Sequence, residues 1–148
     1  MNVLQDIATN SSSCDELWIY YSGHGIENGL VMSDQKLITK QYIHSILYKI
    51  KCPCFILLDC CHSGTILDLR YQYLDSENFN NFTENTKQTE TNGNVVLISG
   101  CMDKQTSADA YINSKFQGAM TWAFLEAVNK TPKISWKDLI TNMRNSLK

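Results

Sequence analysis

Two short motifs in this sequence combine residues that could carry out thiol chemistry. "LLDCCHSG" (57–64) contains two adjacent cysteines followed by a histidine. "YYSGHG" (20–25) contains Ser22, and a second histidine, His24, lies between two glycines. A cysteine thiol becomes a strong nucleophile when a nearby base removes its proton. Cys61 and His24 are the candidate nucleophile and base, and the glycines would let backbone N–H groups approach a reacting oxyanion closely.

Each motif follows a segment with the composition of a buried strand. The expected strands are "ELWIYYS" (16–22), "CFILLDC" (54–60) and "NVVLISG" (94–100). Continuous apolar runs of this length are typical of parallel strands buried on both faces. Open α/β sheets place their sites at the carboxyl ends of such strands, so the two motifs are expected to meet there.

Side chains alternate between the two faces along a strand. If the strand continues in extended form, Asp59 and Cys61 point to one face and Cys60 and His62 to the other. One cysteine then faces the site and the other the core.

Helical patterns separate and follow the strands. Residues 39–51 carry an apolar stripe behind Thr39 as N-cap, 116–130 reads as a second helix, and 135–147 as a third with Ser135 and Asp138 as start signals. The order of elements predicts an α/β fold.

Composition narrows the functional classes. The chain has 148 residues, a formal net charge of −2 and scattered basic residues, which argues against nucleic-acid partners. It shows neither a membrane-length apolar run nor a signal-peptide pattern, and we expect a cytoplasmic protein without membrane partners whose six cysteines are reduced thiols.

A zinc-binding module is the alternative from another class. Its ligands would come from Cys52, Cys54, Cys60, Cys61 and His62. A strand from 54 to 60 would place Cys54 and Cys60 roughly 20 Å apart, whereas two ligands of the same zinc ion lie within about 4 Å of each other. The two cysteine clusters cannot share a metal, and zinc is disfavoured.

The ordered motifs resemble the metacaspases, relatives of the caspases. They are "YYSGHG", "DCCHSGTILDL", "SGCMDKQTSADA" and "GAMTWAFL". The resemblance implies one caspase-like (caspase-hemoglobinase) domain over 1–148, a three-layer sandwich with a mostly parallel sheet. It implies a cysteine endopeptidase with His24 and Cys61 as catalytic residues, and with the N–H groups of Gly25 and Cys61 as oxyanion donors.

The resemblance also implies substrates. Asp59 and Ser22 match residues that line the family's primary specificity pocket, so peptides and proteins should be cut after Arg or Lys. A carboxylate there would pair with a basic side chain. Asp59 could instead only accept backbone N–H bonds, and Ser107 and Asp109 could border the substrate groove or only cap a turn.

The family's opening strands do not precede the first strand here, so we expect an N-terminally incomplete fold. A minimal gene, a fragment and a protein completed by a second polypeptide all fit. The strand at 17–22 would have an open edge, which invites self-association or pairing with a complementary segment. A non-catalytic interaction module or decoy is the alternative function.

No cofactor is expected to be required. Many metacaspases use calcium, and Asp68 and Asp34 match or approximate family ligands, but Thr39 and Lys40 replace the paired acids of the family. Two carboxylates supply few of the 6 to 8 oxygens that calcium prefers, so we expect binding in roughly the millimolar range at best.

Residues 75–93 are rich in Asn, Thr and Glu and lack an apolar period. We expect a mobile loop there. The resemblance implies that it lies between large-subunit-like and small-subunit-like parts. Its basic residue, Lys87, is the expected self-cleavage site, with Arg70 as the alternative.

Overall fold

The computed structural model describes residues 3–73, 80–88, 90–100, 109–112 and 115–147. Ser107 and the side chain of Asp109, which the sequence places beside the substrate groove, lie outside the described residues. The same holds for 75–79 and residue 89 of the expected loop.

A three-stranded parallel sheet forms the centre of the molecule. It consists of β1 (Leu17–Ser22), β5 (Cys54–Asp59) and β8 (Val95–Ser99) in the order β1-β5-β8. β5 is buried along most of its length, as expected for a middle strand covered on both faces. The three strands that the apolar runs predicted are thereby confirmed.

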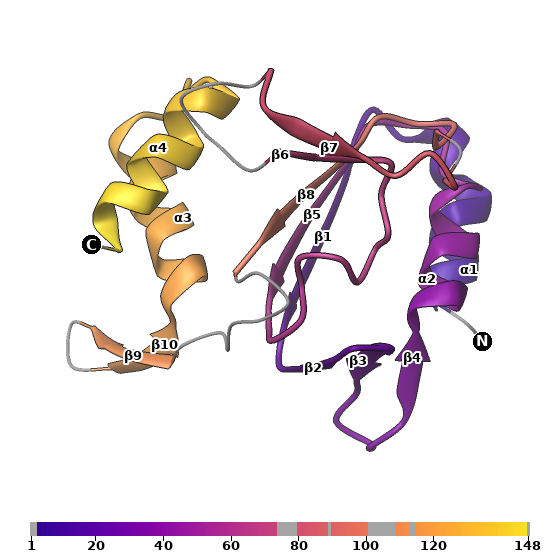
Figure 1. Cartoon of the computed structure of the whole chain (residues 1–148), viewed down its shortest axis with the longest axis horizontal. Coiled ribbons are helices and arrows are strands. Elements are labelled where there is room, and N and C mark those ends of the chain that lie inside the picture. Colours follow the sequence, from indigo (N-terminus) through magenta and orange to yellow (C-terminus); the bar gives the residue numbers. More distant parts are fainter. Residues whose placement is uncertain (1–2, 74–79, 89, 101–108, 113–114, 148) are drawn as a thin grey trace.

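Helices cover both faces of this sheet (Figure 1). Helix α1 (Val3–Asn10), the short 3₁₀ turn Ser11–Ser13 and α2 (Lys40–Leu47) lie on one face, and α3 (Ala119–Lys130) and α4 (Trp136–Ser146) on the other. Each helical layer packs on the sheet through its own apolar cluster. The three-layer α/β sandwich is confirmed.

Capping explains where two of the helices start. The Thr39 side chain accepts a hydrogen bond from the Tyr42 N–H, and the Ser135 side chain accepts one from the Asp138 N–H, as the sequence predicted. Helix α3 starts at Ala119 rather than 116, because the preceding residues form strand β10.

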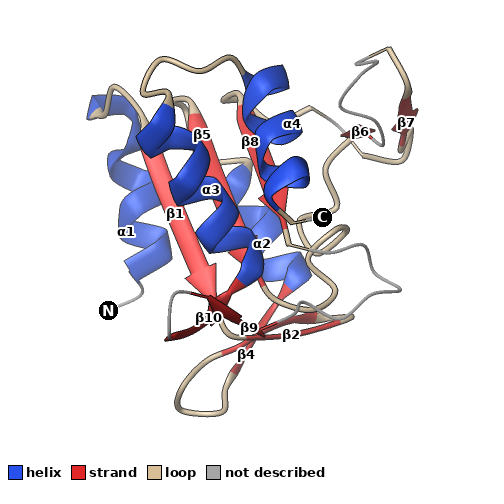
Figure 2. Ribbon diagram, turned by 90° about the vertical axis from the view of Figure 1, so that its left-hand side faces the viewer, coloured by secondary structure: helices blue, strands red, loops and turns tan. Residues whose placement is uncertain are grey.

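Small antiparallel sheets gather at the carboxyl end of the central strands (Figure 2). One consists of β2 (His24–Ile26), β3 (Gly29–Val31) and β4 (Leu37–Thr39), and another of β9 (Asp109–Ile112) and β10 (Lys115–Gly118). A third pair, β6 (Tyr71–Tyr73) and β7 (Phe82–Glu84), lies on the side of the molecule away from β1. The sequence did not predict β7, which falls within the expected loop.

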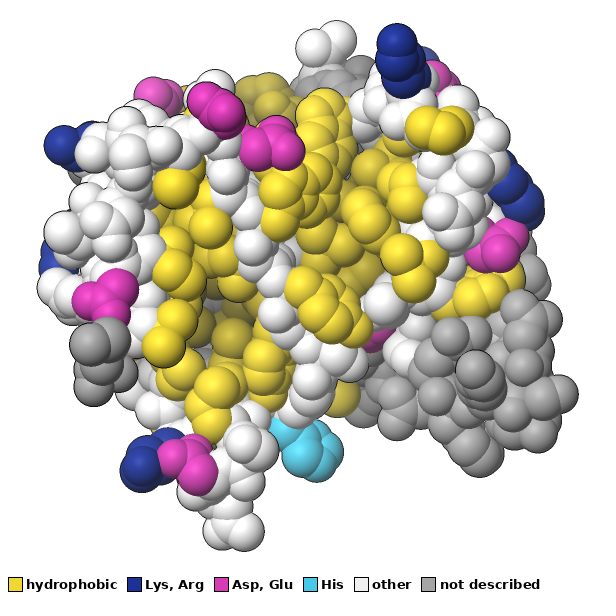
Figure 3. Space-filling model, turned by 180° about the vertical axis from the view of Figure 1, so that it is seen from behind, with side chains coloured by type: hydrophobic (Ala, Val, Ile, Leu, Met, Phe, Trp, Pro, Cys, Tyr) yellow, Lys and Arg dark blue, Asp and Glu magenta, His cyan; other side chains and the backbone are white. Residues whose placement is uncertain are grey.

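Strand β1 is an edge strand in the part of the chain that the structure describes. The N–H groups of Leu17 and Gly23 donate to carbonyls of the β5 segment, so the N–H and C=O groups of Trp18 and Tyr20 point to the other side. Their side chains are 50% and 56% exposed. The space-filling view from behind shows hydrophobic side chains over the middle of this face and charged ones around its rim (Figure 3).

Within the residues that the structure describes, no helix is both long and apolar enough to cross a membrane.

Candidate active site

The two motifs meet because β1 and β5 are adjacent and parallel. Ser22, the last residue of β1, pairs in register with Asp59, the last residue of β5. Paired residues of neighbouring strands present their side chains to the same face, here the face covered by α3. The structure therefore brings together the two residues expected to bind the substrate, and His24 and Cys61 each follow this pair by two residues.

The residues after Asp59 do not continue the strand, which corrects the expected alternation. β5 ends at Asp59, the chain then turns, and His62 adopts a φ of 56°, in the left-handed region. The opposite orientation of Asp59 and Cys60 holds, because Cys60 is 1% exposed within the core beneath α1 and α2. Cys61 belongs to the turn and is partly exposed.

Gly25 brings the two motifs into direct contact. A Cβ atom at this position would collide with the backbone carbonyl oxygen of Cys61 and would lie 2.9 Å from the Cys60 Sγ. Only a residue without a side chain allows this approach. The segment that carries His24 thus packs against the backbone of the candidate nucleophile, and both expected oxyanion residues lie at this contact.

Tyr21 fixes the start of the β2–β3 hairpin. Its hydroxyl lies 3.0 Å from the His24 carbonyl and 2.7 Å from the Val31 carbonyl. Burial, followed by the charge of a Cys60 thiolate, raises the pKa of Tyr21, so the hydroxyl stays protonated and can donate. Tyr21 therefore holds the backbone of His24, whose side chain is exposed. No pattern in the sequence points to this role for Tyr21.

Asp59 is 4% exposed and binds the start of α3. Its Oδ2 accepts hydrogen bonds from the Thr121 N–H (2.9 Å) and the Thr121 hydroxyl (2.5 Å). The sequence had left open that Asp59 accepts a backbone N–H bond, and it does so. No pattern in the sequence pointed to Thr121, which lies within an apolar helical run.

The two calcium candidates already have other partners. The Asp68 carboxylate accepts hydrogen bonds from the side chains of Asn85 (3.2 Å) and Gln88 (2.5 Å), and Asp34 forms an ion pair with Lys36 (2.9 Å). Lys36 also lowers the pKa of Asp34. No three His, Cys, Asp or Glu side chains converge on a metal-sized site within the described part of the chain. In this structure the carboxylates of Asp68 and Asp34 therefore bind other side chains.

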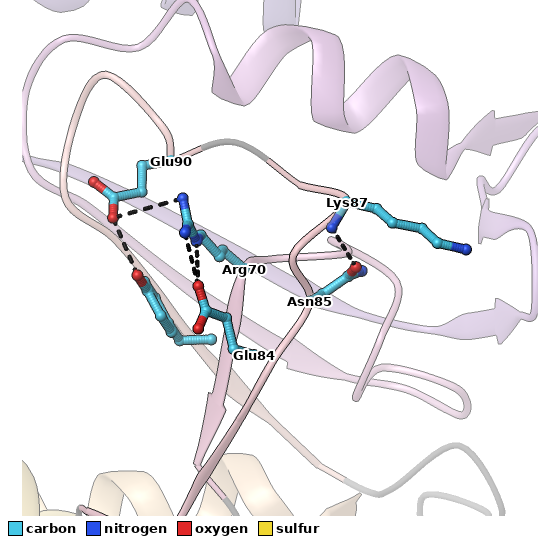
Figure 4. Close-up of polar contacts among 6 residues, drawn as sticks. Arg70, Glu84, Asn85, Lys87 and Glu90 are labelled. Carbon is cyan, nitrogen blue, oxygen red and sulfur yellow. Dashed lines mark hydrogen bonds and ion pairs between the residues drawn. The ribbon is translucent and has the colours of Figure 1, made fainter.

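The two basic residues considered for self-cleavage have different surroundings (Figure 4). The Arg70 guanidinium donates from Nε (2.9 Å) and from a terminal nitrogen (2.7 Å) to Glu84, and it lies 3.9 Å from Glu90. Lys87 is exposed, its side chain extends away from Asn85, and only its backbone N–H contacts the Asn85 side chain (3.2 Å). Of the two, Lys87 is the more accessible.

The remaining described cysteines differ strongly in environment. Cys52 and Cys54 are buried, and burial raises the pKa of Cys54 to about 12, whereas Cys14 is exposed. A buried thiol with a raised pKa is a poor nucleophile and a poor metal ligand. Cys61 is therefore the accessible thiol at the carboxyl end of the sheet among the described residues.

Comparison with known proteins identifies the family. A family model described as the caspase domain of peptidase family C14 matches residues 1–148, and the chain belongs to this family. The resemblance inferred from the motifs is confirmed.

Fungal metacaspases are among the similar proteins. Metacaspase-1 of Mycosarcoma maydis is 30% identical over 195 residues, covering 90% of this chain and 48% of that protein. Metacaspase-1 of Scheffersomyces stipitis is 27% identical, covering 99% of this chain and 52% of the relative. Metacaspase-1A of Neurospora crassa is also 27% identical, covering 99% of this chain and 46% of that protein. The chain spans about half the length of the curated relatives it matches.

Proposed function

We propose that this chain is a cysteine endopeptidase that cleaves peptide bonds after Arg or Lys, with Cys61 as nucleophile and His24 as base. The β1–β5 register is the observation that carries the proposal. It places Ser22 beside Asp59 and brings the segments of His24 and Cys61 into contact at Gly25.

The proposed reaction follows from these positions. His24 accepts the thiol proton of Cys61, and the sulfur attacks the scissile carbonyl carbon. The N–H groups of Gly25 and Cys61 stabilise the oxyanion of the tetrahedral intermediate. His24 then protonates the leaving amine, and a water molecule hydrolyses the thioester to release the acid and restore the thiol.

Asp59 is proposed to select the basic residue, and peptide substrates test this. Fluorogenic peptides ending in Arg or Lys should be cleaved faster than the same peptide ending in Gln. In Asp59→Asn the amide oxygen can still accept from Thr121, but the charge is lost. We expect this variant to lower kcat/KM for the Arg peptide by roughly 10- to 100-fold, the value of a charge-assisted hydrogen bond.

The Gln peptide is the internal control, since its cleavage should change little in Asp59→Asn. Equal cleavage of Arg and Gln peptides by the wild type would refute the proposed specificity. A folded protein that cleaves neither peptide, and whose Cys61 resists a peptidyl-arginine chloromethyl ketone, would support the non-catalytic interaction module instead.

Self-cleavage is proposed to follow Lys87. Lys87→Gln should abolish the cut, whereas Arg70→Gln should leave it in place. Because Asp68 holds Asn85 and Gln88 on either side of Lys87, Asp68→Ala should free the segment and increase the cleavage rate several-fold. Mass spectrometry of the products in active protein and in Cys61→Ala measures this, and cuts present in both would come from a contaminating protease.

The open edge of β1 is proposed to pair with an extended segment of another chain, in the first instance a second copy. Sedimentation velocity over a range of concentrations should show association. Trp18→Lys places a charge on the edge strand and should weaken association at least about tenfold. Tyr73→Lys on β6 is the matched control, because Tyr73 is also aromatic and is 53% exposed against 50% for Trp18, and β6 lies on the side of the molecule away from β1. A wild type that stays monomeric at all concentrations would contradict the proposal.

Calcium is proposed not to be required. An ion at Asp68 would have to displace two amide donors, and an ion at Asp34 would have to displace Lys36. Even if both amides turned their oxygens toward the ion, Asp68, Asn85 and Gln88 would supply fewer than the 6 to 8 oxygens that calcium prefers, which supports weak binding at most.

A further inference from the structure

We propose that the N-terminus of α3 is a positioning element for the specificity carboxylate, in which Thr121 orients Asp59 and Gly118 leaves room for it. This inference rests on the proposed role of Asp59 in binding Arg or Lys.

Thr121 restrains Asp59 in two ways. It is the third residue of α3, so its N–H has no partner within the helix and is available to an outside acceptor. The N-cap residue, Gly118, has no side chain that could cap the helix. Asp59, which precedes α3 by some sixty residues, supplies that acceptor, while the Thr121 hydroxyl binds the same carboxylate oxygen. Two donors from one residue define the plane of the carboxylate as well as its position.

The direction of the hydrogen bonds can be worked out from the donors. A carboxylate only accepts, so the single proton of the Thr121 hydroxyl goes to Asp59. The contact between the Tyr20 hydroxyl and Thr121 Oγ1 (3.1 Å) must then be donated by Tyr20. A chain of hydrogen bonds therefore runs from Tyr20 on β1 through Thr121 to Asp59, and Tyr20 fixes the rotamer of the threonine.

Gly118 is the steric part of this arrangement. A Cβ atom on Gly118 would collide with the Asp59 Oδ2 and would lie 2.6 Å from its Cγ. Any larger residue would push the carboxylate out of its position or shift the start of α3. The small residue and the threonine, three positions apart, together shape one side of the proposed pocket.

The consequence concerns substrate selection rather than the reaction itself. A carboxylate held in one orientation binds a guanidinium or ammonium group without first losing rotational freedom. Thr121 does not contact Cys61 or His24 in any described interaction, so its loss should affect basic substrates and spare the thiol.

The test compares Thr121→Val with Thr121→Ser. Valine keeps the shape and the backbone N–H but removes the hydroxyl, and should lower the ratio of kcat/KM for Arg over Gln peptides about tenfold, mainly through KM. Serine restores the hydroxyl and should restore the ratio. Thr141→Val on α4 is the matched control, and Gly118→Ala should resemble Thr121→Val.

A second measurement does not depend on turnover. Labelling of Cys61 by a peptidyl-arginine chloromethyl ketone should slow in Thr121→Val, while labelling by iodoacetamide, which does not use the pocket, should stay within about twofold. Equal slowing with both reagents, or an unchanged ratio of Arg to Gln cleavage, would overturn the inference.

Asp59→Asn separates failure of this inference from failure of the proposed function. If Asp59→Asn abolishes the Arg preference but Thr121→Val does not, Thr121 has no positioning role and the proposed pocket stands. If Asp59→Asn leaves the preference intact, the proposed role of Asp59 is wrong and the inference falls with it.

Discussion

Replacement of Cys61 by alanine should lower peptide cleavage by at least about a thousandfold, because the proposed reaction then has no nucleophile. His24→Ala should lower it by roughly 100- to 10,000-fold through loss of the general base. Both effects are measured as kcat with a fluorogenic Arg peptide, after circular dichroism has shown that each variant is folded.

Adjacent and like residues provide the controls. Cys60→Ala removes a thiol next in sequence that lies in the core, so most of the activity should remain. His44→Ala removes a histidine on α2 whose ring meets that of Tyr48 edge to face, away from the candidate site. Equal losses in folded Cys60→Ala and Cys61→Ala would contradict the assignment of Cys61 alone as the nucleophile, and so would alkylation at Cys60 in the native protein.

The central sheet was predictable from the composition of its strands. β5 is buried on both faces, which requires the continuous apolar run that ends at Asp59. β1 is exposed at every second residue, and its run to Ser22 stands out through its aromatic and β-branched residues instead. Adjacency of β1 and β5 then follows from the usual preference for helical crossovers between neighbouring parallel strands. The meeting of the two motifs at the carboxyl ends of these strands could thus be predicted from the sequence, whereas the choice of Ser22 and Asp59 as candidate specificity residues came from the family resemblance.

The small sheets were not predictable from the same signals. Strands β2, β3 and β4 have three residues each, too few for an apolar alternation to appear. β7 is exposed throughout, and the polar contact of Arg70 with Glu84 links it to the β6 side of the hairpin. Backbone hydrogen bonds between strands and ion pairs hold such segments in place, and a pattern of hydrophobic residues does not predict these contacts.

Local rules also failed where the chain turns. Strand alternation predicts opposite faces for Cys61 and His62, but β5 ends at Asp59 and His62 lies in a turn with a positive φ. Thr121 shows a second limit of prediction from sequence patterns, since a threonine within an apolar helical run suggests a packing role alone. Its role depends on a contact with Asp59, which is distant in sequence and visible only in three dimensions.

Gly25→Ala should nearly abolish cleavage, with a loss of at least about 100-fold. The added Cβ would meet the Cys61 carbonyl oxygen, which is backbone and cannot rotate away as a side chain could. Relief therefore requires a shift of β2 or of the turn that carries Cys61, and either shift misplaces an oxyanion donor relative to the sulfur. Loss of one oxyanion donor alone costs about 100- to 1,000-fold in kcat.

Gly93→Ala distinguishes this effect from general strain. Its Cβ would also meet a backbone carbonyl, that of Cys52 at 2.5 Å, but before the start of β5 and away from the site. Both variants should lose about 1 to 3 kcal/mol of unfolding free energy from overpacking, measured by denaturant titration. Only Gly25→Ala should lose cleavage at a temperature where both are folded. Comparable rates in the two variants, at a temperature where both are folded, would mean that the close approach of Gly25 to Cys61 serves folding alone, because both variants press a Cβ atom against a backbone carbonyl and only Gly25 does so at the candidate site.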